Sequence, residues 1–143
     1  MRKRLTQGLP YLDSNVFIYP VIYDERTVPK SRKAKDVLTQ VSTGGLRGFT
    51  STLTWDEVVW VTLKVLGHKD SLEQGQKFLG FPNLTLLSID EATLTRAQKV
   101  MEKYDLKPRD ALHAAAAIES GQSEMISDDP TFDKVREIKR KPL

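Results

Sequence analysis

The chain contains no cysteine among its 143 residues. This absence excludes disulfide bonds, zinc–thiolate sites and cysteine nucleophiles. The sequence also lacks any apolar run approaching the ~20 residues that a transmembrane helix needs. Its charged N-terminus is not followed, before Pro10, by the apolar stretch of a signal peptide. We therefore expect a cytoplasmic protein without a membrane anchor, whose chemistry depends on oxygen and nitrogen groups.

The overall charge is small, because 22 Lys and Arg face 19 Asp and Glu to give a formal net charge of +3. The basic residues gather at the two ends, in an N-terminal extension over residues 1–8 and a C-terminal end over residues 134–143. Such ends are either solvated or attract a polyanion. The length suits a single domain over residues 1–143, and the hydrophobic content of 39% is enough for a core.

Hydrophobic periodicity predicts that strands alternate with helices. Segment 9–19 is predicted as a buried strand that runs into a turn at residues 13–15. Further strands are expected over residues 47–53, 84–89, 124–127 and 135–139, and helices over residues 31–41, 54–66, 71–79, 90–104 and 108–120. This alternation predicts a three-layer α/β/α domain with a mostly parallel central sheet of about five strands.

Two acidic positions directly follow predicted strands. Asp13 interrupts an apolar segment, and Asp128 and Asp129 follow the short apolar run 125–126. Ligands of open α/β sheets bind beyond the carboxyl ends of the strands, which favours a functional role for these acids. Turn formation is the alternative interpretation, since Asp-Ser-Asn and Asp-Asp-Pro are both common in turns.

Two further acids lie near predicted helix starts. Glu57 follows Thr54 by three residues, which is the spacing of a capping box, so it is either a cap or a functional acid. Asp110 lies in a first turn, where an acid also favours the helix dipole. The helix that Asp110 opens is rich in alanine and should pack close to the sheet. His113, one turn on, is interpreted as a packing residue or one that supports the site.

Four acids from four separate elements would meet at one edge of a doubly wound sheet. Carboxylates packed together raise each other's pKa unless a cation neutralises them. Oxygen ligands without histidine or cysteine select Mg²⁺ or Mn²⁺. Such an ion activates water and stabilises charge on a phosphate, so hydrolysis of a phosphodiester is the chemistry that this pattern favours.

These motifs, in this order, resemble those of PIN domains, especially the short prokaryotic proteins related to VapC toxins. The resemblance covers nearly the whole chain and rests on residues 12–16, Glu57, residues 110–115 and residues 126–132. It implies cleavage of single-stranded RNA with Mg²⁺ or Mn²⁺ as cofactor. It also implies a homodimer and, in many relatives, a small antitoxin protein as partner.

The resemblance also implies roles for individual residues. The catalytic acids would be Asp13, Glu57, Asp110 and Asp129, with Asp13, Asp110 and Asp129 as metal ligands and Ser14, Asn15 and Asp128 in support. Many relatives have another acid two residues after the last Asp, where this chain has Thr131. Asp128 is the candidate to replace it, so the sequence leaves open whether Asp128 or Asp129 is the fourth acid.

Two alternatives remain at this level. The chain could be a non-catalytic PIN-like module that binds RNA or protein, with its acids serving as caps and turns. It could also be a phosphatase with Asp13 as nucleophile, but the haloacid dehalogenase type has a second Asp two positions later, where this chain has Asn15.

Overall fold

Five parallel strands form the centre of the fold in the computed structural model of the chain, which describes residues 9–122 and 124–143. The basic extension expected over residues 1–8 lies outside the described residues. The strands are β1 (Tyr11–Leu12), β2 (Gly48–Ser51), β3 (Leu84–Leu87), β4 (Glu124–Ile126) and β5 (Lys139–Lys141). Their order in the sheet is β3-β2-β1-β4-β5.

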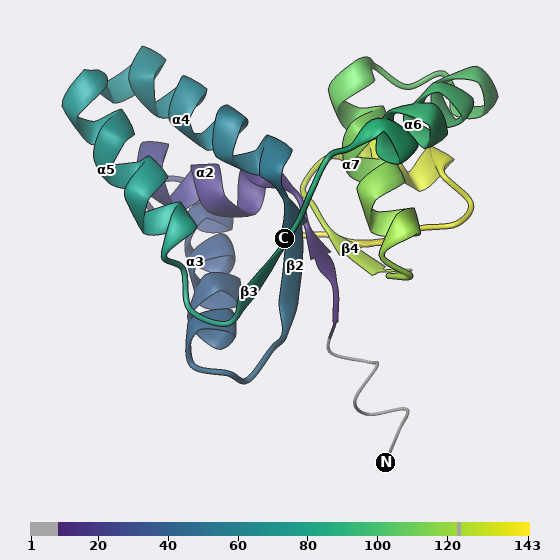
Figure 1. The fold of residues 1–143 in the computed structure, drawn as a ribbon. Coiled ribbons are helices and arrows are strands. Elements are labelled where there is room, and N and C mark those ends of the chain that lie inside the picture. The colour runs from purple at the N-terminus through teal and green to yellow at the C-terminus, as the bar shows by residue number, and fades with distance from the viewer. Residues whose placement is uncertain (1–8, 123) are drawn as a thin grey trace.

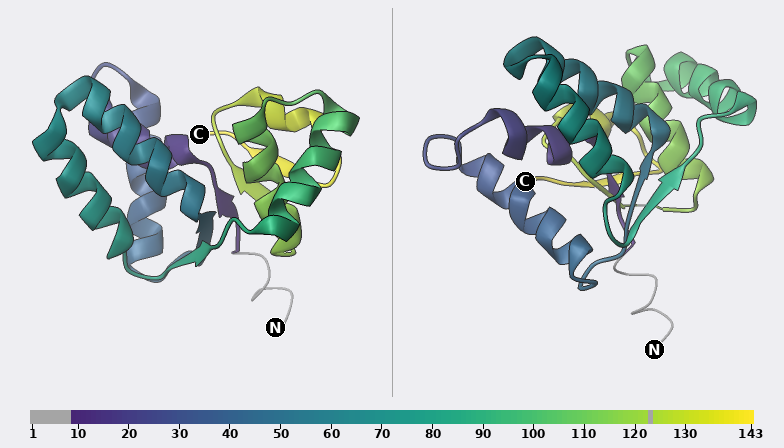
Figure 2. Two further views of the ribbon diagram at one scale, coloured as in Figure 1. Left: turned by 45° about the horizontal axis from the view of Figure 1, so that its top comes forward. Right: turned by 60° about the vertical axis from the view of Figure 1, so that its left-hand side comes forward.

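Helices cover both faces of this sheet (Figure 1). One layer contains α2 (Ser14–Ile22), α3 (Pro29–Ser42), α4 (Thr52–Leu66) and α5 (His68–Leu79). The other contains α6 (Glu91–Tyr104), α7 (Pro108–Glu119) and the 3₁₀ helix η1 (Pro130–Lys134). The left panel of Figure 2 shows the strands between these two layers. The predicted three-layer fold with a parallel sheet is therefore confirmed.

Each layer has its own apolar core. Buried residues of β1, β4, α6, α7 and η1 form one cluster, and buried residues of α2, α3, α4 and α5 form another with Leu12 and Ile126. Neighbouring residues of a strand point to opposite faces, so Tyr11 belongs to the first cluster and Leu12 to the second. Among the described residues, no helix has both the length and the apolar character needed to cross a bilayer.

The strand order reverses between β1 and β4. From β1 the chain proceeds outward through β2 to β3, and it returns to the other side of β1 with β4 and then β5. The carboxyl ends of β1 and β4 therefore lie side by side at the switch point where open α/β sheets bind ligands. Asp13 follows β1 at this point, and residues 127–129 follow β4.

The segment after Asp13 is a helix, so the prediction of a strand and turn over residues 9–19 was wrong beyond β1. Asp13 is the N-cap of α2, and its side chain accepts a hydrogen bond from the backbone N–H of Ser14. Val16 and Phe17 are buried in the core on this helix. A short apolar run fits a buried helix as well as a strand, and periodicity alone does not separate the two.

The expected capping box at Thr54 is also absent. Helix α4 begins at Thr52, with Ser51 as an N-cap that makes no side-chain cap hydrogen bond. The hydroxyl of Thr54 is buried and pairs with that of Thr50 at 2.7 Å. Glu57 consequently lies in the second turn of α4, with a carboxylate that is available for other contacts.

The last strand is displaced from its expected position over residues 135–139. Val135 and Ile138 are buried in the core, and β5 begins only at Lys139 and pairs with β4. In this register, the carbonyl oxygen of Lys141 in β5 accepts a hydrogen bond from the backbone N–H of Ser127, the residue that follows β4. The basic C-terminal end therefore supports the segment that carries the last acids.

The small side chains of α7 allow this helix to pack closely. Residues 111 and 114–117 are all alanine and are buried. We predict that Ala114→Leu lowers the free energy of unfolding by about 1–3 kcal/mol, because overpacking forces the helix away from the sheet. Denaturant unfolding tests this, with Ala92→Leu on the exposed side of α6 as control. An Ala114→Leu variant as stable as the control would contradict the close packing.

Candidate active site

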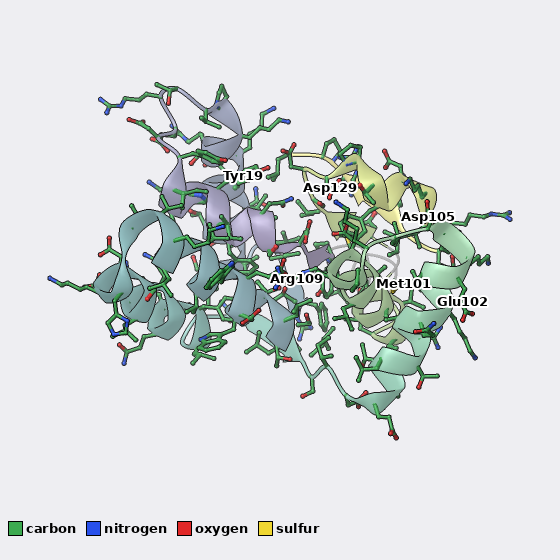
Figure 3. All side chains as sticks on the ribbon, turned by 90° about the horizontal axis from the view of Figure 1, so that it is seen from above. Tyr19, Met101, Glu102, Asp105, Arg109 and Asp129 are labelled. Atoms are coloured by element: carbon green, nitrogen blue, oxygen red, sulfur yellow. The ribbon has the colours of Figure 1, made fainter. Side chains whose placement is uncertain are left out.

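The four acids predicted from the sequence all lie on the carboxyl side of the sheet. Asp13 directly follows β1, Asp129 is in the loop after β4, Glu57 is on α4, and Asp110 is in the first turn of α7. Figure 3 shows this side from above, with Asp129 and Arg109, the residue before Asp110, both near the middle of the view. Carboxylates from elements far apart in the sequence therefore lie on the same side of the sheet.

The acids are close enough to influence one another's ionisation. Burial raises the pKa of Asp110, and the negative charges of Asp129, Asp13 and Glu57 raise it further, whereas His113 opposes this shift. Like charges raise the pKa of a carboxyl group only when they lie nearby. The convergence that the sequence predicted is thus present in the fold.

Asp13 is held rigidly. Its side chain is almost fully buried and accepts hydrogen bonds from the Ser14 backbone at 2.8 Å, the Asn15 amide at 3.2 Å and the Ser127 hydroxyl at 2.6 Å. Burial raises the pKa of Asp13, while His113 and the bonds from Ser127 and Ser14 work in the opposite direction. Position 15, which would carry a second Asp in a haloacid dehalogenase phosphatase, instead donates an amide hydrogen to Asp13.

Ser127 connects three parts of the site, and the sequence analysis did not single it out. Its buried hydroxyl donates to Asp13 and accepts from the backbone N–H of Asp129 at 3.0 Å and the amide of Asn15 at 3.3 Å. The available signal was its place in the last motif, where Thr or Ser precedes the acid by two residues. Ser127 thereby fixes the loop after β4 against the end of β1.

His113 lies between two of the acids. Its ring is almost fully buried, and its Nε2 contacts Glu57 Oε1 and lies 3.7 Å from Asp13 Oδ1. Its Nδ1 pairs with the Tyr11 hydroxyl at 2.7 Å, and that hydroxyl donates to Ser51 Oγ at 2.9 Å. His113 is therefore more than a packing residue, since it contacts the carboxylates directly.

The environment of His113 favours its cationic form. Burial alone would lower the pKa of His113, but the Tyr11 oxygen, the hydrogen bond to Glu57 and the charge of Asp13 outweigh burial and hold the pKa well above its usual value. The protonated ring neutralises part of the negative charge that Asp13 and Glu57 bring to the site.

Asp128 and Asp129 have different surroundings although they are neighbours. Asp128 accepts a hydrogen bond from the Tyr19 hydroxyl at 2.7 Å and pairs with Lys30 Nζ at 2.6 Å. Burial disfavours the ionised form, but Lys30 and Tyr19 hold the pKa of Asp128 below its usual value. Asp129 instead accepts from the Thr131 backbone at 2.9 Å and acts on Asp110. Asp129 is thus the member of the pair whose charge acts on Asp110.

The donor set suits a hard divalent cation in its chemistry. Carboxylates that repel one another around Asp110 are what Mg²⁺ or Mn²⁺ would neutralise, and the oxygen donors match the preference of both ions. As the side chains stand, no group of three or more His, Asp or Glu in residues 9–122 and 124–143 is arranged to hold a metal ion. Ion binding would therefore require the carboxylate side chains to change their orientation.

Comparisons with solved structures agree with this fold. A toxin–antitoxin complex from Klebsiella pneumoniae contains a chain 19% identical to this one, with 91% of this chain and 95% of that chain covered and a TM-score of 0.66. A DNA-bound VapBC from Salmonella typhimurium gives 17% identity, 94% and 98% coverage and a TM-score of 0.71. VapC20 from Mycobacterium tuberculosis is described as a toxin that cleaves the sarcin–ricin loop. It is 14% identical to this chain, with 90% of this chain and 95% of that chain covered and a TM-score of 0.70.

At such low identities these similarities establish the fold alone. No curated protein matches the sequence significantly. The sequence profile of the PIN domain matches residues 11–138, which span β1 through the residue before β5 and include every acid of the site. The resemblance that the motifs indicated is thereby confirmed, and the chain belongs to the PIN domain family.

Proposed function

We propose that this chain is a VapC-like endoribonuclease that hydrolyses phosphodiester bonds of single-stranded RNA with Mg²⁺ or Mn²⁺ as cofactor. The observation that carries the proposal is the gathering of Asp13, Glu57, Asp110 and Asp129 from four elements at the switch point of the sheet, with a raised pKa at Asp110. Membership of a nuclease family supports the reaction class. The preference for single-stranded RNA comes from the family resemblance.

Each acid has its own task in this proposal. Asp13, Asp110 and Asp129 would hold the divalent ion, which when bound supplies a water activated for attack and stabilises charge on the phosphate. Ser127 and Asn15 keep Asp13 oriented, because both donate hydrogen bonds to its carboxylate. Glu57 orients the attacking water, and His113 holds the Glu57 carboxylate in place through their hydrogen bond.

Exposed cations at the edge of the site support a polyanionic substrate. Lys107, the N-cap of α7, and Arg109, in the first turn of this helix, are exposed and precede Asp110 in the sequence. Lysine and arginine side chains of this kind hold a nucleic-acid backbone through charge, without reading its sequence. We expect them to contribute to affinity for RNA rather than to the chemical step.

An antitoxin partner is proposed on the basis of the relatives and of an apolar groove. Structures with this fold have been determined as toxin–antitoxin complexes. In this chain a groove of about 420 Å³ between α2 and the α4–α5 pair is lined by Phe17, Pro20, Phe78 and Phe81. An apolar segment of an antitoxin would cover the partly exposed Pro20 and Phe81, since Phe17 and Phe78 are already buried in the core. A homodimer, also expected from the resemblance, can be tested by light scattering at several protein concentrations.

We predict that purified protein cleaves labelled single-stranded RNA when Mn²⁺ is present and stops when EDTA is added. The reason is that the acids cannot position a water or stabilise a phosphate without the cation that neutralises them. p-Nitrophenyl phosphate, the substrate for the phosphatase alternative, should remain intact. Cleavage that persists in EDTA would contradict the proposal. RNA binding without any cleavage would instead support the non-catalytic module.

A further inference from the structure

Asp128 connects the loop after β4 to the helical layer that contains α2 and α3. Its Oδ2 accepts from Tyr19 on α2, and its Oδ1 pairs with Lys30 in the first turn of α3. Asp128 itself belongs to the loop between β4 and η1, on the other side of the switch point. We call these three residues the Asp128 bridge.

The bridge lies at the edge of the site rather than within it. Tyr19 and Asp129 are both labelled in Figure 3, where Tyr19 lies on the α2 side of the view and Asp129 on the η1 side. Both carboxylate oxygens of Asp128 are engaged by the α2–α3 layer. Each Asp128 oxygen therefore has a partner in that layer.

Asp128 is also linked to the acids through the backbone. Its N–H donates to Asn15 Oδ1 at 3.5 Å, and the Asn15 amide in turn donates to Asp13 and Ser127. The next residue is Asp129, whose backbone N–H is held by Ser127. A change in the bridge would therefore be transmitted to the position of Asp129 relative to Asp13.

We propose that the Asp128 bridge positions the loop carrying Asp129 against Asp13, which makes Asp128, Tyr19 and Lys30 positioning residues and assigns ion binding in this loop to Asp129. This inference rests on the proposed metal-dependent function. The ion pair has a second effect. Lys30 neutralises the negative charge of Asp128 beside the site, which reduces repulsion of a polyanionic substrate.

The test compares Tyr19→Phe and Lys30→Met with matched controls. Tyr23→Phe changes an exposed residue whose ring packs edge-on against Tyr19, and Lys33→Met removes an exposed cation from the same helix as Lys30. We expect each bridge variant to lower kcat about tenfold and to weaken Mn²⁺ affinity, measured by calorimetry, about tenfold. These losses are at the lower end of those caused by removing residues that orient metal ligands. The KM for RNA should change little, and Lys30→Arg should retain most of the activity.

Two further comparisons identify the role of Asp128. Asp128→Ala should reduce kcat about tenfold, whereas Asp129→Asn should abolish cleavage, because only Asp129 would hold the ion. The double variant Tyr19→Phe/Lys30→Met should be little worse than either single variant, since both act through Asp128. A loss in Asp128→Ala as complete as that in Asp129→Asn would overturn the proposal. A raised KM with unchanged kcat in Lys30→Met would also overturn it, because Lys30 would then bind RNA directly.

A readout independent of activity separates this inference from the proposed function. Hydrogen exchange over residues 127–134 should become faster in Tyr19→Phe and stay unchanged in Tyr23→Phe, because only the first change removes a bond to the loop. Equal exchange in both variants would refute the bridge even if the protein is a nuclease. The opposite combination is also informative. If hydrogen exchange is faster in Tyr19→Phe, but the wild-type protein neither binds Mn²⁺ nor cleaves RNA, the proposed function is refuted and the bridge is retained.

Discussion

Asp110→Asn is expected to reduce Mn²⁺-dependent RNA cleavage about a thousand-fold, at the upper end of what removing one electrostatic stabiliser costs an enzyme. The same change should leave the free energy of unfolding of the metal-free protein unchanged or raise it. Burial and the charges of Asp129 and Asp13 raise the pKa of Asp110, so its ionised form is disfavoured in the folded chain. A neutral amide removes this repulsion and keeps the shape of the side chain.

Cleavage rates and denaturant unfolding, measured on the same preparations, test this prediction. Asp105→Asn is the matched control, because Asp105 is exposed, ends α6 in a left-handed conformation that Asn also adopts, and is not among the acids of the site. The control should keep full activity. If Asp110→Asn cleaves RNA as fast as the control, Asp110 does not hold the ion. A large loss of stability in Asp110→Asn would show that Asp110 is structural instead.

His113→Leu is expected to lower the free energy of unfolding of the metal-free protein by about 3–5 kcal/mol, the range for removing one partner of a buried ion pair. The change leaves the Tyr11 hydroxyl, Glu57 and the buried Asp13 without the ring that contacts them. Leu fills similar space, so the loss reflects polar contacts rather than a cavity. His68→Leu, at an exposed position, is the control and should have little effect.

The pH dependence of stability follows from the same contacts. Because the folded protein raises the pKa of His113 above its value of about 6.5 in an unfolded chain, His113 contributes fully below that pH. The contribution is lost as the pH rises through the folded pKa. Metal-free protein should therefore become less stable from about pH 6.5 upward, and His113→Leu should flatten this decline. Saturating Mn²⁺ should restore part of the stability of the variant.

Much of the fold could be predicted because its signals are periodic. Alternating strands and helices predicted a parallel sheet, and the carboxyl ends of parallel strands then placed Asp13 and Asp129 at one edge. The first turn of α7 was marked by Pro108, which begins that helix as expected. These features depend on local pattern and on a general rule of sheet topology.

The features that the sequence did not reveal depend on partners distant along the chain. The spacing of Thr54 and Glu57 fits a capping box, yet Thr54 pairs with Thr50 in the strand before it, and Glu57 contacts His113. The motif favours Asp129, but the sequence leaves open whether Asp128 or Asp129 is the fourth acid. They differ in the fold because Tyr19 and Lys30 bind only Asp128.

Ser127 and His113 show the same limit. Local pattern marks a serine after a strand as a turn residue, and it gives a histidine on an alanine-rich helix a packing or supporting role without naming its partners. Their contacts with Asp13 exist only once α7, β1 and β4 are assembled.

Anomalous diffraction from crystals soaked in Mn²⁺ is the most direct test of a divalent-ion site built by acids from separate elements. We predict a peak bounded by carboxylate oxygens of Asp13, Asp110 and Asp129, with Asp128 still bound to Lys30 and Tyr19. Crystals with no peak at this position, at Mn²⁺ concentrations that support RNA cleavage, would contradict the account.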